Sequence, residues 1–368
     1  MPTPWRLRIF FRESAFAAVA FTIAIYLYTL TANWGVQDYL AEGPLKDYLS
    51  HPAVHVENVM AGVMFGVLLG LVNWLTERVW LTSRSLGLVV LVRSALYLAG
   101  LGFVFVAVVA LFILTRILPV DTLREIVGAF SPRYLFSIVI WLAAVGVGIN
   151  FLLEIRRMVG QGNLWRLLTG HYRRPRDEER VFLFMDLVGS TGAAERMGHE
   201  RYSQFIQACF RDLTGVALES GGTIYQYVGD EVVMTWPAEG EGARMRAVQA
   251  FFGYERSLAE RGPWYLDKFG MVPVFRGGID VGSVIATEVG ELTRAIAYHG
   301  DVLNTASRLL DLCKEREGRL LVSEGVGGQV MDDATVMVGW QDEVRMKGKE
   351  SATRVFSLEP GGKDIGGA

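Results

Sequence analysis

The chain has 368 residues, enough for two domains, and 51% of them are hydrophobic while only 20% are charged. Its formal net charge of −3 gives no electrostatic basis for binding nucleic acid, so we expect no nucleic-acid partner. The two cysteines, Cys209 and Cys313, are too few for a disulfide framework or a cysteine zinc site.

Four apolar stretches without charged residues lie in the first half of the chain. Each is long enough, or nearly so, to cross a bilayer as a helix, which requires about 20 residues. The shortest is Val59–Thr76, for which a buried helix of a soluble domain is the alternative interpretation. The first stretch is too long and too aromatic for a secretory signal, so we expect it to remain as an anchor in membrane lipid. The four stretches are Ser14–Gln37, Val59–Thr76, Ser94–Thr115 and Tyr134–Leu153.

The distribution of arginine predicts the orientation of these helices. Arginines gather before the first stretch, between the second and third, and after the fourth. The segment between the third and fourth stretches also has three, Arg116, Arg124 and Arg133, but Asp121 and Glu125 offset them. The segment between the first and second stretches has only Lys46 against several acidic residues. Because cytoplasmic loops carry an excess of Lys and Arg, we expect both termini in the cytoplasm and the protein in the inner (plasma) membrane. The arginines that support this are Arg6, Arg8, Arg12, Arg78, Arg84, Arg93, Arg156, Arg157, Arg166, Arg173, Arg174 and Arg176.

A segment of partly helical spacing follows the fourth stretch. Glu154–His171 carries apolar residues at helical intervals, but Gly160 and Gly162 interrupt the pattern and Pro175 ends it. The segment is either a coupling element or a passive tether. We therefore expect a four-helix transmembrane domain over residues 1–153, a cytoplasmic coupling segment over 154–177, a second domain over 178–360 and a disordered tail over 361–368.

From Val181 onward, strand patterns alternate with patterns of amphipathic helices. The order strand–helix–strand–strand–helix–strand is typical of an α+β sandwich of ferredoxin-like type. Helices are expected at Glu200–Glu219, at Glu241–Arg261 and, with Asp301 as N-cap, from Val302 to about Lys314. Strands are expected at Val181–Met185, Thr223–Val228, Glu231–Trp236, Val274–Gly282, Ser283–Glu288, Leu320–Ser323, Thr335–Val338 and Thr353–Leu358.

Two carboxylates stand at the ends of expected strands, each close to a glycine. Asp186 follows the hydrophobic run Val181–Met185, and Asp230 follows Gly229 in a pair that suits a tight hairpin. Mg²⁺ usually takes one or two carboxylates together with phosphate oxygens. If the strands are neighbours, the two aspartates can hold divalent cations against a triphosphate, and the backbone carbonyl of Leu187 can add a ligand. Taken singly, such an aspartate is more often a turn former or a cap.

Two further motifs complete the pattern. The turn Gly189-Ser190-Thr191 opens a helix, and the free amides at a helix N-terminus can bind phosphate. Asn304 and Arg308 lie one helical turn apart, so they share a face of the helix expected there. In this order, the motifs resemble the catalytic domain of the class III nucleotidyl cyclases over about Val181 to Glu359.

This resemblance implies roles for individual residues. It implies an adenylate cyclase with two Mg²⁺ or Mn²⁺ ions per site, held by Asp186, Leu187 and Asp230. Asn304 would position the ribose of ATP and Arg308 would contact its phosphates. A phosphate-binding lysine in a late loop matches Lys347 best, with Lys349 or a plain solvated charge as the alternatives. Since the family draws the metal ligands and the Asn–Arg pair from different subunits, the resemblance also implies a homodimer with composite sites.

Two positions depart from the family at the place where it recognises the purine. Adenylate-forming members usually carry a lysine where this chain has Gln226, and an Asp or Thr where it has Ala297. The residues that guanylate-forming members carry at these two positions also differ from Gln226 and Ala297. The Gln226 amide can donate and accept hydrogen bonds, so it suits either purine, whereas the Ala297 side chain can read neither. The family favours ATP, and the alternatives are GTP, mixed specificity, or an inactive nucleotide-binding membrane receptor.

Overall fold

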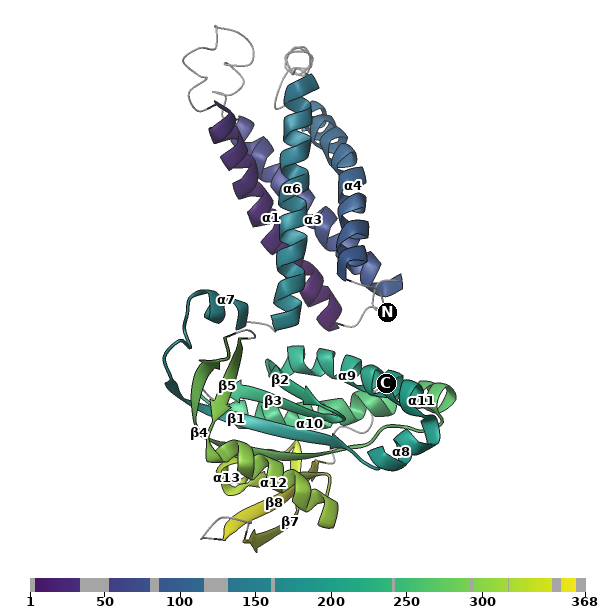
Figure 1. The fold of residues 1–368 in the computed structure, drawn as a ribbon, viewed down its shortest axis with the longest axis vertical. Coiled ribbons are helices and arrows are strands. Elements are labelled where there is room, and N and C mark those ends of the chain that lie inside the picture. The colour runs from purple at the N-terminus through teal and green to yellow at the C-terminus, as the bar shows by residue number, and fades with distance from the viewer. Residues whose placement is uncertain are drawn as a thin grey trace. The chain divides into compact units, whose positions relative to one another are not determined.

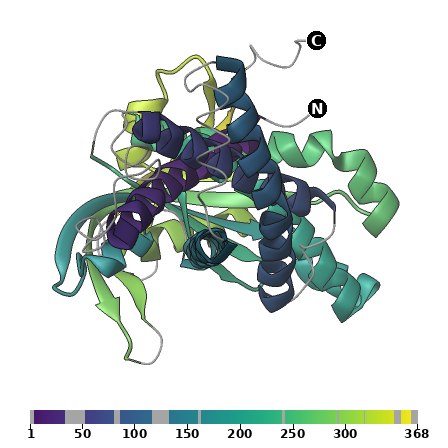
Figure 2. The ribbon, with the colours of Figure 1, turned by 90° about the horizontal axis from the view of Figure 1, so that it is seen from above.

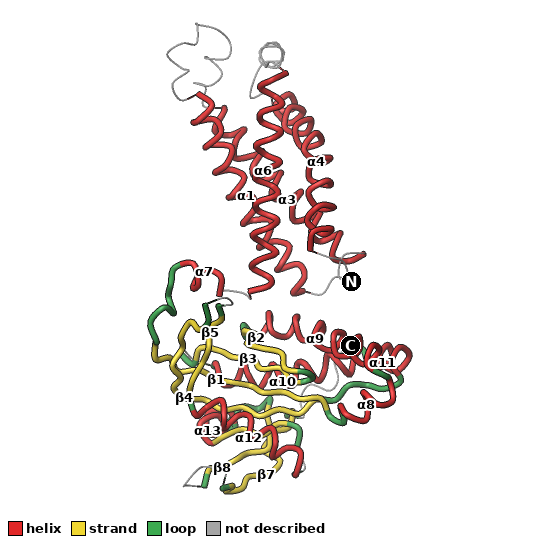
Figure 3. Tube along the Cα trace, in the orientation of Figure 1, coloured by secondary structure: helices red, strands yellow, loops and turns green. Residues whose placement is uncertain are grey.

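The computed structural model describes residues 4–33, 53–79, 86–115, 132–159, 163–239, 242–291, 294–316, 318–345 and 352–361. The chain divides into two compact units, Met1–Val159 and Gly160–Ala368. In its described part, the first unit is entirely helical, whereas the second combines helices with a sheet (Figure 3). The expected change of architecture between the two halves is therefore confirmed.

The first unit contains four long helices, α1 (Pro4–Asn33), α3 (Ala53–Val79), α4 (Leu86–Thr115) and α6 (Pro132–Val159) (Figure 1). All four are long and apolar enough to cross a membrane. This confirms the four expected helices, including the one at Val59–Thr76. Every helix begins before the apolar stretch that predicted it, because a helix can continue beyond the part that lipid covers. The span in α1, for example, is Leu7–Thr31.

Glycines let α1 and α3 approach closely. Gly62, Gly66 and Gly70 recur every four residues on α3 and face small residues of α1. A Cβ atom at Gly66 would lie 2.4 Å from the backbone nitrogen of Ala18, so no larger residue fits there without movement. Such a stripe of small residues is a common way for membrane helices to pack backbone against backbone.

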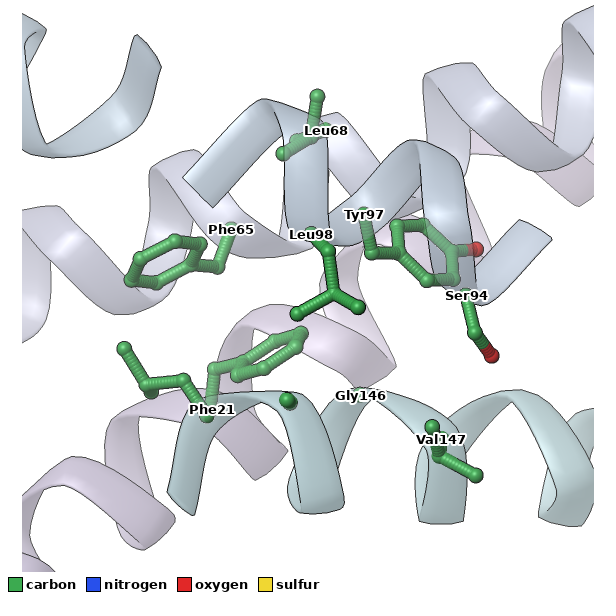
Figure 4. Close-up of a pocket in the computed structure, with 10 residues that line it drawn as sticks. Phe21, Phe65, Leu68, Ser94, Tyr97, Leu98, Gly146 and Val147 are labelled. Atoms are coloured by element: carbon green, nitrogen blue, oxygen red, sulfur yellow. The ribbon is translucent and has the colours of Figure 1, made fainter. Parts of the chain in front are cut away.

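The interior of this helical unit contains both a small apolar cavity and a buried ion pair. Phe21, Phe65, Tyr97 and Gly146 line a cavity of about 10 Å³, room for about one water molecule (Figure 4). Elsewhere, Arg93 is only 3% exposed and pairs with Glu154 at 3.2 Å, joining α4 to α6. Charged groups inside a membrane are tolerated when they are paired in this way.

The second unit is built on an eight-stranded sheet with the order β2-β3-β1-β4-β6-β8-β7, and β5 pairs with β4 outside this path. The strands are β1 (Arg176–Leu187), β2 (Thr223–Val228), β3 (Glu231–Pro237), β4 (Phe275–Val289), β5 (Ala295–His299), β6 (Leu320–Ser323), β7 (Val336–Val344) and β8 (Thr353–Pro360). The helices are α7 (Asn163–Leu168), α8 (Ser190–Met197), α9 (His199–Ser220), α10 (Ala243–Glu260), α11 (Gly262–Phe269), α12 (Asp301–Glu315) and α13 (Glu324–Val330).

Both faces of the central strand β1 are buried, which explains its uninterrupted hydrophobic run. Val181, Leu183 and Met185 point into a core that α9 and α10 cover. Phe182 and Phe184 point to the other face, where α12 packs. We call this second face the α12 face. The α+β architecture expected from the order of elements is confirmed.

Several boundaries differ from the sequence-based expectation. Val274–Gly282 and Ser283–Glu288 are not two strands but one strand, β4, because Gly282 and Ser283 both pair with β1 in one unbroken ladder. The short elements β5, α11 and α13 were not expected. Asp301 is the first residue of α12 and not its N-cap, which is Gly300. Cys209 and Cys313 are buried free thiols.

Candidate active site

The two aspartates meet at one end of the sheet. Asp186 is the penultimate residue of β1, and β1 pairs with β3 up to Met185↔Val232. Gly229, with φ of +62°, and Asp230 form the tight turn between β2 and β3, as the sequence predicts. Asp186 is therefore next to the hairpin that carries Asp230. Burial raises the pKa of the Asp186 carboxyl, and the nearby Asp230 carboxyl raises it further.

A lysine at the end of α12 reaches this end of the sheet, where Arg276 of β4 also stands opposite Asp186. The Lys314 ammonium, at the end of α12, is 3.6 Å from Asp186 and 2.9 Å from Asp311. Burial raises the pKa of Glu231, and the charge of Asp186 adds to this effect. The carboxylates Asp186, Asp230 and Glu231 therefore give this end of the sheet an excess of negative charge that Lys314 offsets only in part, which is an environment that favours a divalent cation.

The carboxylates at this end of the sheet suit a metal ion whose remaining ligands come from phosphate and water. Among the described residues, no three His, Cys, Asp or Glu side chains are arranged to hold a metal ion by themselves. Two adjacent carboxylates, one of them with a raised pKa, match the Mg²⁺ preference for one or two protein carboxylates plus phosphate and water oxygens. The arrangement therefore suits metal binding together with a nucleotide.

The expected phosphate-binding turn follows β1 directly. Gly189 adopts the left-handed conformation, with φ of +71°, and α8 begins at Ser190. The first amides of a helix lack partners within it, and Ser190 and Thr191 contribute two of them. Leu187 is buried at the end of β1, opposite Phe275 of β4. These residues therefore adjoin Asp186 along the chain.

A β-bulge turns Gln226 toward the α12 face. Ile224 pairs with Met234, but Gln226 pairs with Val233, so Tyr225 is an extra residue in β2. Opposed residues in a ladder point to the same face, and Val233 belongs to the core of the α12 face. Gln226 therefore shares a face with Phe184 and Asp186, and its side chain is exposed. Without the bulge it would point toward the core under α9 and α10.

The second position that the resemblance assigns to purine recognition lies on the short strand β5. Ala297 pairs with Thr287 of β4 and is half-buried. The next side chain, Tyr298, is not available to replace the one that Ala297 lacks. Its ring is only 8% exposed and packs 5.6 Å from Phe182. His299, the residue after Tyr298, is exposed.

The Asn–Arg pair lies on the outer side of α12. A Cβ atom at Gly278 of β4 would lie 2.3 Å from the carbonyl oxygen of Ala306, so α12 rests directly on the sheet backbone. Asn304 is exposed and Arg308 is half-buried, and neither side chain makes a hydrogen bond or ion pair with another described residue. The structure therefore brings Asp186 and Asp230 together but does not bring this pair to them within one chain. Lys347 and Lys349 lie outside the described residues.

The raised pKa of Asp186 leads to a prediction about stability. A raised pKa means that the ionised carboxylate destabilises the folded state above the ordinary carboxyl pKa, and that this penalty disappears as the pH falls toward it. Asp186→Asn should therefore raise the melting temperature of the metal-free protein at pH 7 by about 2–4 °C, and by less near pH 4. Thermal melts in EDTA, with the exposed Asp311→Asn as control, measure this. A lower melting temperature for Asp186→Asn at pH 7 would contradict the assignment.

Comparisons with known proteins identify relatives. The chain is 34% identical over 233 residues to "Adenylate cyclase 2" of Rhizobium meliloti, covering 63% of this chain and 64% of that protein. It is 26% identical over 190 residues to a terminal-differentiation-specific adenylate cyclase of Dictyostelium discoideum, covering 50% of this chain and 9% of the relative. The chain thus spans less than two thirds of the length of these curated relatives. No protein-family model matches it.

The fold also has counterparts among solved structures. A bacterial light-regulated adenylyl cyclase superposes with a TM-score of 0.50 at 17% identity, covering 63% of this chain and 67% of that one. At this identity the likeness concerns the fold alone.

Proposed function

We propose, from the premise that the second unit belongs to the class III nucleotidyl cyclases, that this chain converts ATP into 3′,5′-cyclic AMP and pyrophosphate. The observation that carries the proposal is the pairing of Asp186 with Asp230 at one sheet end, beside a helix N-terminus. The relatives named adenylate cyclases support ATP as the substrate. The apolar helices support a membrane protein, and the arginine distribution supports a cytoplasmic active site in the inner membrane.

The reaction requires the ribose 3′-hydroxyl to attack the α-phosphate in line with the departing pyrophosphate. Asp186 and Asp230, with the Leu187 carbonyl, would hold two Mg²⁺ or Mn²⁺ ions, which acidify the hydroxyl and neutralise the triphosphate when bound. The amides of Ser190 and Thr191 would donate hydrogen bonds to phosphate oxygens.

The remaining groups come from the partner subunit in this proposal. Asn304 would orient the ribose, and Arg308 and Lys347 would stabilise the negative charge that develops on the phosphates. Both Asn304 and Arg308 lack partners among the described residues, as groups waiting for a ligand would. A homodimer then contains two composite sites, and a monomer is inactive. The segment over 154–177 would join the membrane domain to the catalytic domain over 178–360.

Guanylate or mixed specificity is the second candidate function. Gln226 is exposed on the α12 face, where its amide can bond either purine, and Ala297 offers no side-chain hydrogen bond. Nothing in these two side chains therefore rejects guanine. Specificity rests on the backbone of β5 and on the exposed His299 nearby.

The decisive experiment supplies the purified full-length protein with Mn²⁺ and either ATP or GTP, and resolves the cyclic products by mass. We expect cyclic AMP as the main product. The double variant Gln226→Lys/Ala297→Asp should increase the preference for ATP over GTP by about tenfold or more, because it adds charged hydrogen-bonding groups. Equal amounts of cyclic GMP in the wild type would favour mixed specificity. No product from a verified dimer would favour the inactive receptor.

A further inference from the structure

A buried arginine occupies the α12 face at the opposite end of β1 from the aspartates. Arg180 is only 2% exposed. Its Nε donates to the hydroxyl of Thr235 at 3.0 Å, and its Nη1 lies 2.8 Å from Oε2 of Glu178. Arginine cannot give up its charge, and a buried charge is costly unless it is paired and hydrogen-bonded. Arg180 is therefore a buried, paired charge that the fold holds in one position, and not a member of a surface ion pair.

The free face of this guanidinium covers an aromatic ring of β5. The Arg180 Cζ atom lies 4.7 Å from the centroid of the Tyr298 ring, within the range of a cation–π contact. The same ring touches Tyr225, at 5.1 Å between centroids, on the bulged strand beside Gln226. Tyr298 directly follows Ala297, so these contacts connect Arg180 to both purine-reading positions.

Strand β5 has few supports besides Tyr298, chiefly the partly buried Ile296, which packs against the core of the α12 face. It pairs with β4 alone and stands outside the main path of the sheet. Figure 2 shows the β4–β5 hairpin projecting from the rest of its unit. A strand that is hydrogen-bonded along one edge depends on side-chain contacts for its position. Within β5, Tyr298 is the residue whose side chain is buried.

The segment before β1 completes the arrangement. Tyr172 is 1% exposed, and its hydroxyl donates to Oε1 of Glu178 at 2.8 Å. It accepts from Nη1 of Arg166 in α7 at 2.7 Å, and its backbone carbonyl accepts from the amide of Glu288 in β4 at 2.8 Å. Glu178 therefore uses one oxygen for Tyr172 and the other for Arg180.

We propose that Arg180 is a positioning residue for β5, held in place by Glu178 and by the Tyr172 hydroxyl, so that these groups set nucleoside binding. The proposal rests on the proposed function, which places the nucleoside at β5. Arg180 and Asp186 are six residues apart on β1, about 20 Å along the strand. Changes to these contacts should therefore alter the affinity for the nucleoside and leave the metal requirement unchanged.

Tyr172→Phe tests the proposal because it removes only the hydroxyl. We expect the KM for ATP to rise roughly three- to tenfold, the scale of one lost hydrogen bond, with kcat and the Mn²⁺ requirement nearly unchanged. Tyr254→Phe is the matched control, since it removes a buried hydroxyl that donates to the Cys209 carbonyl at 3.0 Å under the other face. It should lower thermal stability without changing KM. Equal KM values for both variants would overturn the proposal.

A binding measurement separates this inference from the function itself. A fluorescent 3′-deoxy analogue of ATP lacks the attacking hydroxyl, so its affinity for the full-length protein can be measured without turnover. We expect Tyr172→Phe to weaken its binding by the same factor as KM rises, and Glu178→Gln to weaken it more. If the wild type makes no cyclic product yet Tyr172→Phe still weakens binding, the proposed function fails and the positioning role stands. Unchanged binding in folded Tyr172→Phe overturns the positioning role.

Discussion

Replacing either Asp186 or Asp230 with alanine should reduce turnover by at least about a hundredfold to a thousandfold, the scale seen when one group that stabilises the transition state is lost. The two side chains lie together at one sheet end, so each variant removes half of the carboxylate set that would hold the metal ions. Product formation by purified full-length protein, at saturating ATP and Mn²⁺, measures the effect.

The control for this prediction is Asp311→Asn. Asp311 carries the same charge and bonds Lys314 close to the site, but it is exposed and has no proposed role in catalysis. It should change turnover only slightly. All variants should keep the oligomeric state of the wild type in size-exclusion chromatography. Near wild-type turnover in Asp186→Ala or Asp230→Ala would refute the metal assignment.

Two inactive variants should restore each other when their defects lie in different halves of the composite site. Co-expressing Asp186→Ala with Arg308→Ala should give about a quarter of wild-type turnover, since random pairing makes about half the dimers mixed, each with one intact site. The basis is that Arg308 does not reach Asp186 within one chain, where the described partners of Asp186 are Asp230 and Lys314. Differently tagged subunits allow the mixed dimers to be isolated and assayed.

Pairing Asp186→Ala with Asp230→Ala provides the control, because both defects lie in the metal half and every site then lacks a ligand. This pair should stay inactive. If isolated mixed dimers of Asp186→Ala and Arg308→Ala are equally inactive, the active site is not shared between subunits.

The sequence predicts the helices and strands whose hydrophobic residues recur in a regular pattern. It misses those that form because of contacts with residues far away in the chain. The run Val181–Met185 has no polar residue, because both faces of β1 are covered, and its position was predicted within the strand. The sequence predicts the end of a strand at Gly282, yet β4 continues through it without a break, and the glycine that α12 approaches closely is Gly278. The helix α13 holds three glycines, which disfavour helix formation, and forms because Val326 and Val330 are buried.

The candidate site divides in the same way. Asp230 could be placed because Gly229-Asp230 is a turn signal readable from two residues. The nearness of Lys314 to Asp186, and the contacts of Arg180, join positions far apart in the chain and have no local signature. An arginine with a glutamate two residues before it, at the start of a strand, was the only sequence signal at Glu178 and Arg180. Such a pair is ordinarily a solvated one.

The bulge at Tyr225 decides how this domain should be aligned with its relatives. Residues 226–228 pair in register with residues 231–233, so a count backward from Gly229 reaches Gln226, the position proposed to face the nucleotide, whatever lies earlier in the strand. A count forward from the end of α9 crosses the extra residue and assigns the wrong face to everything beyond it. Insertions before Tyr225 would therefore leave the register of residues 226–228 unchanged, whereas insertions after it would change which side chain occupies the position proposed to meet the base.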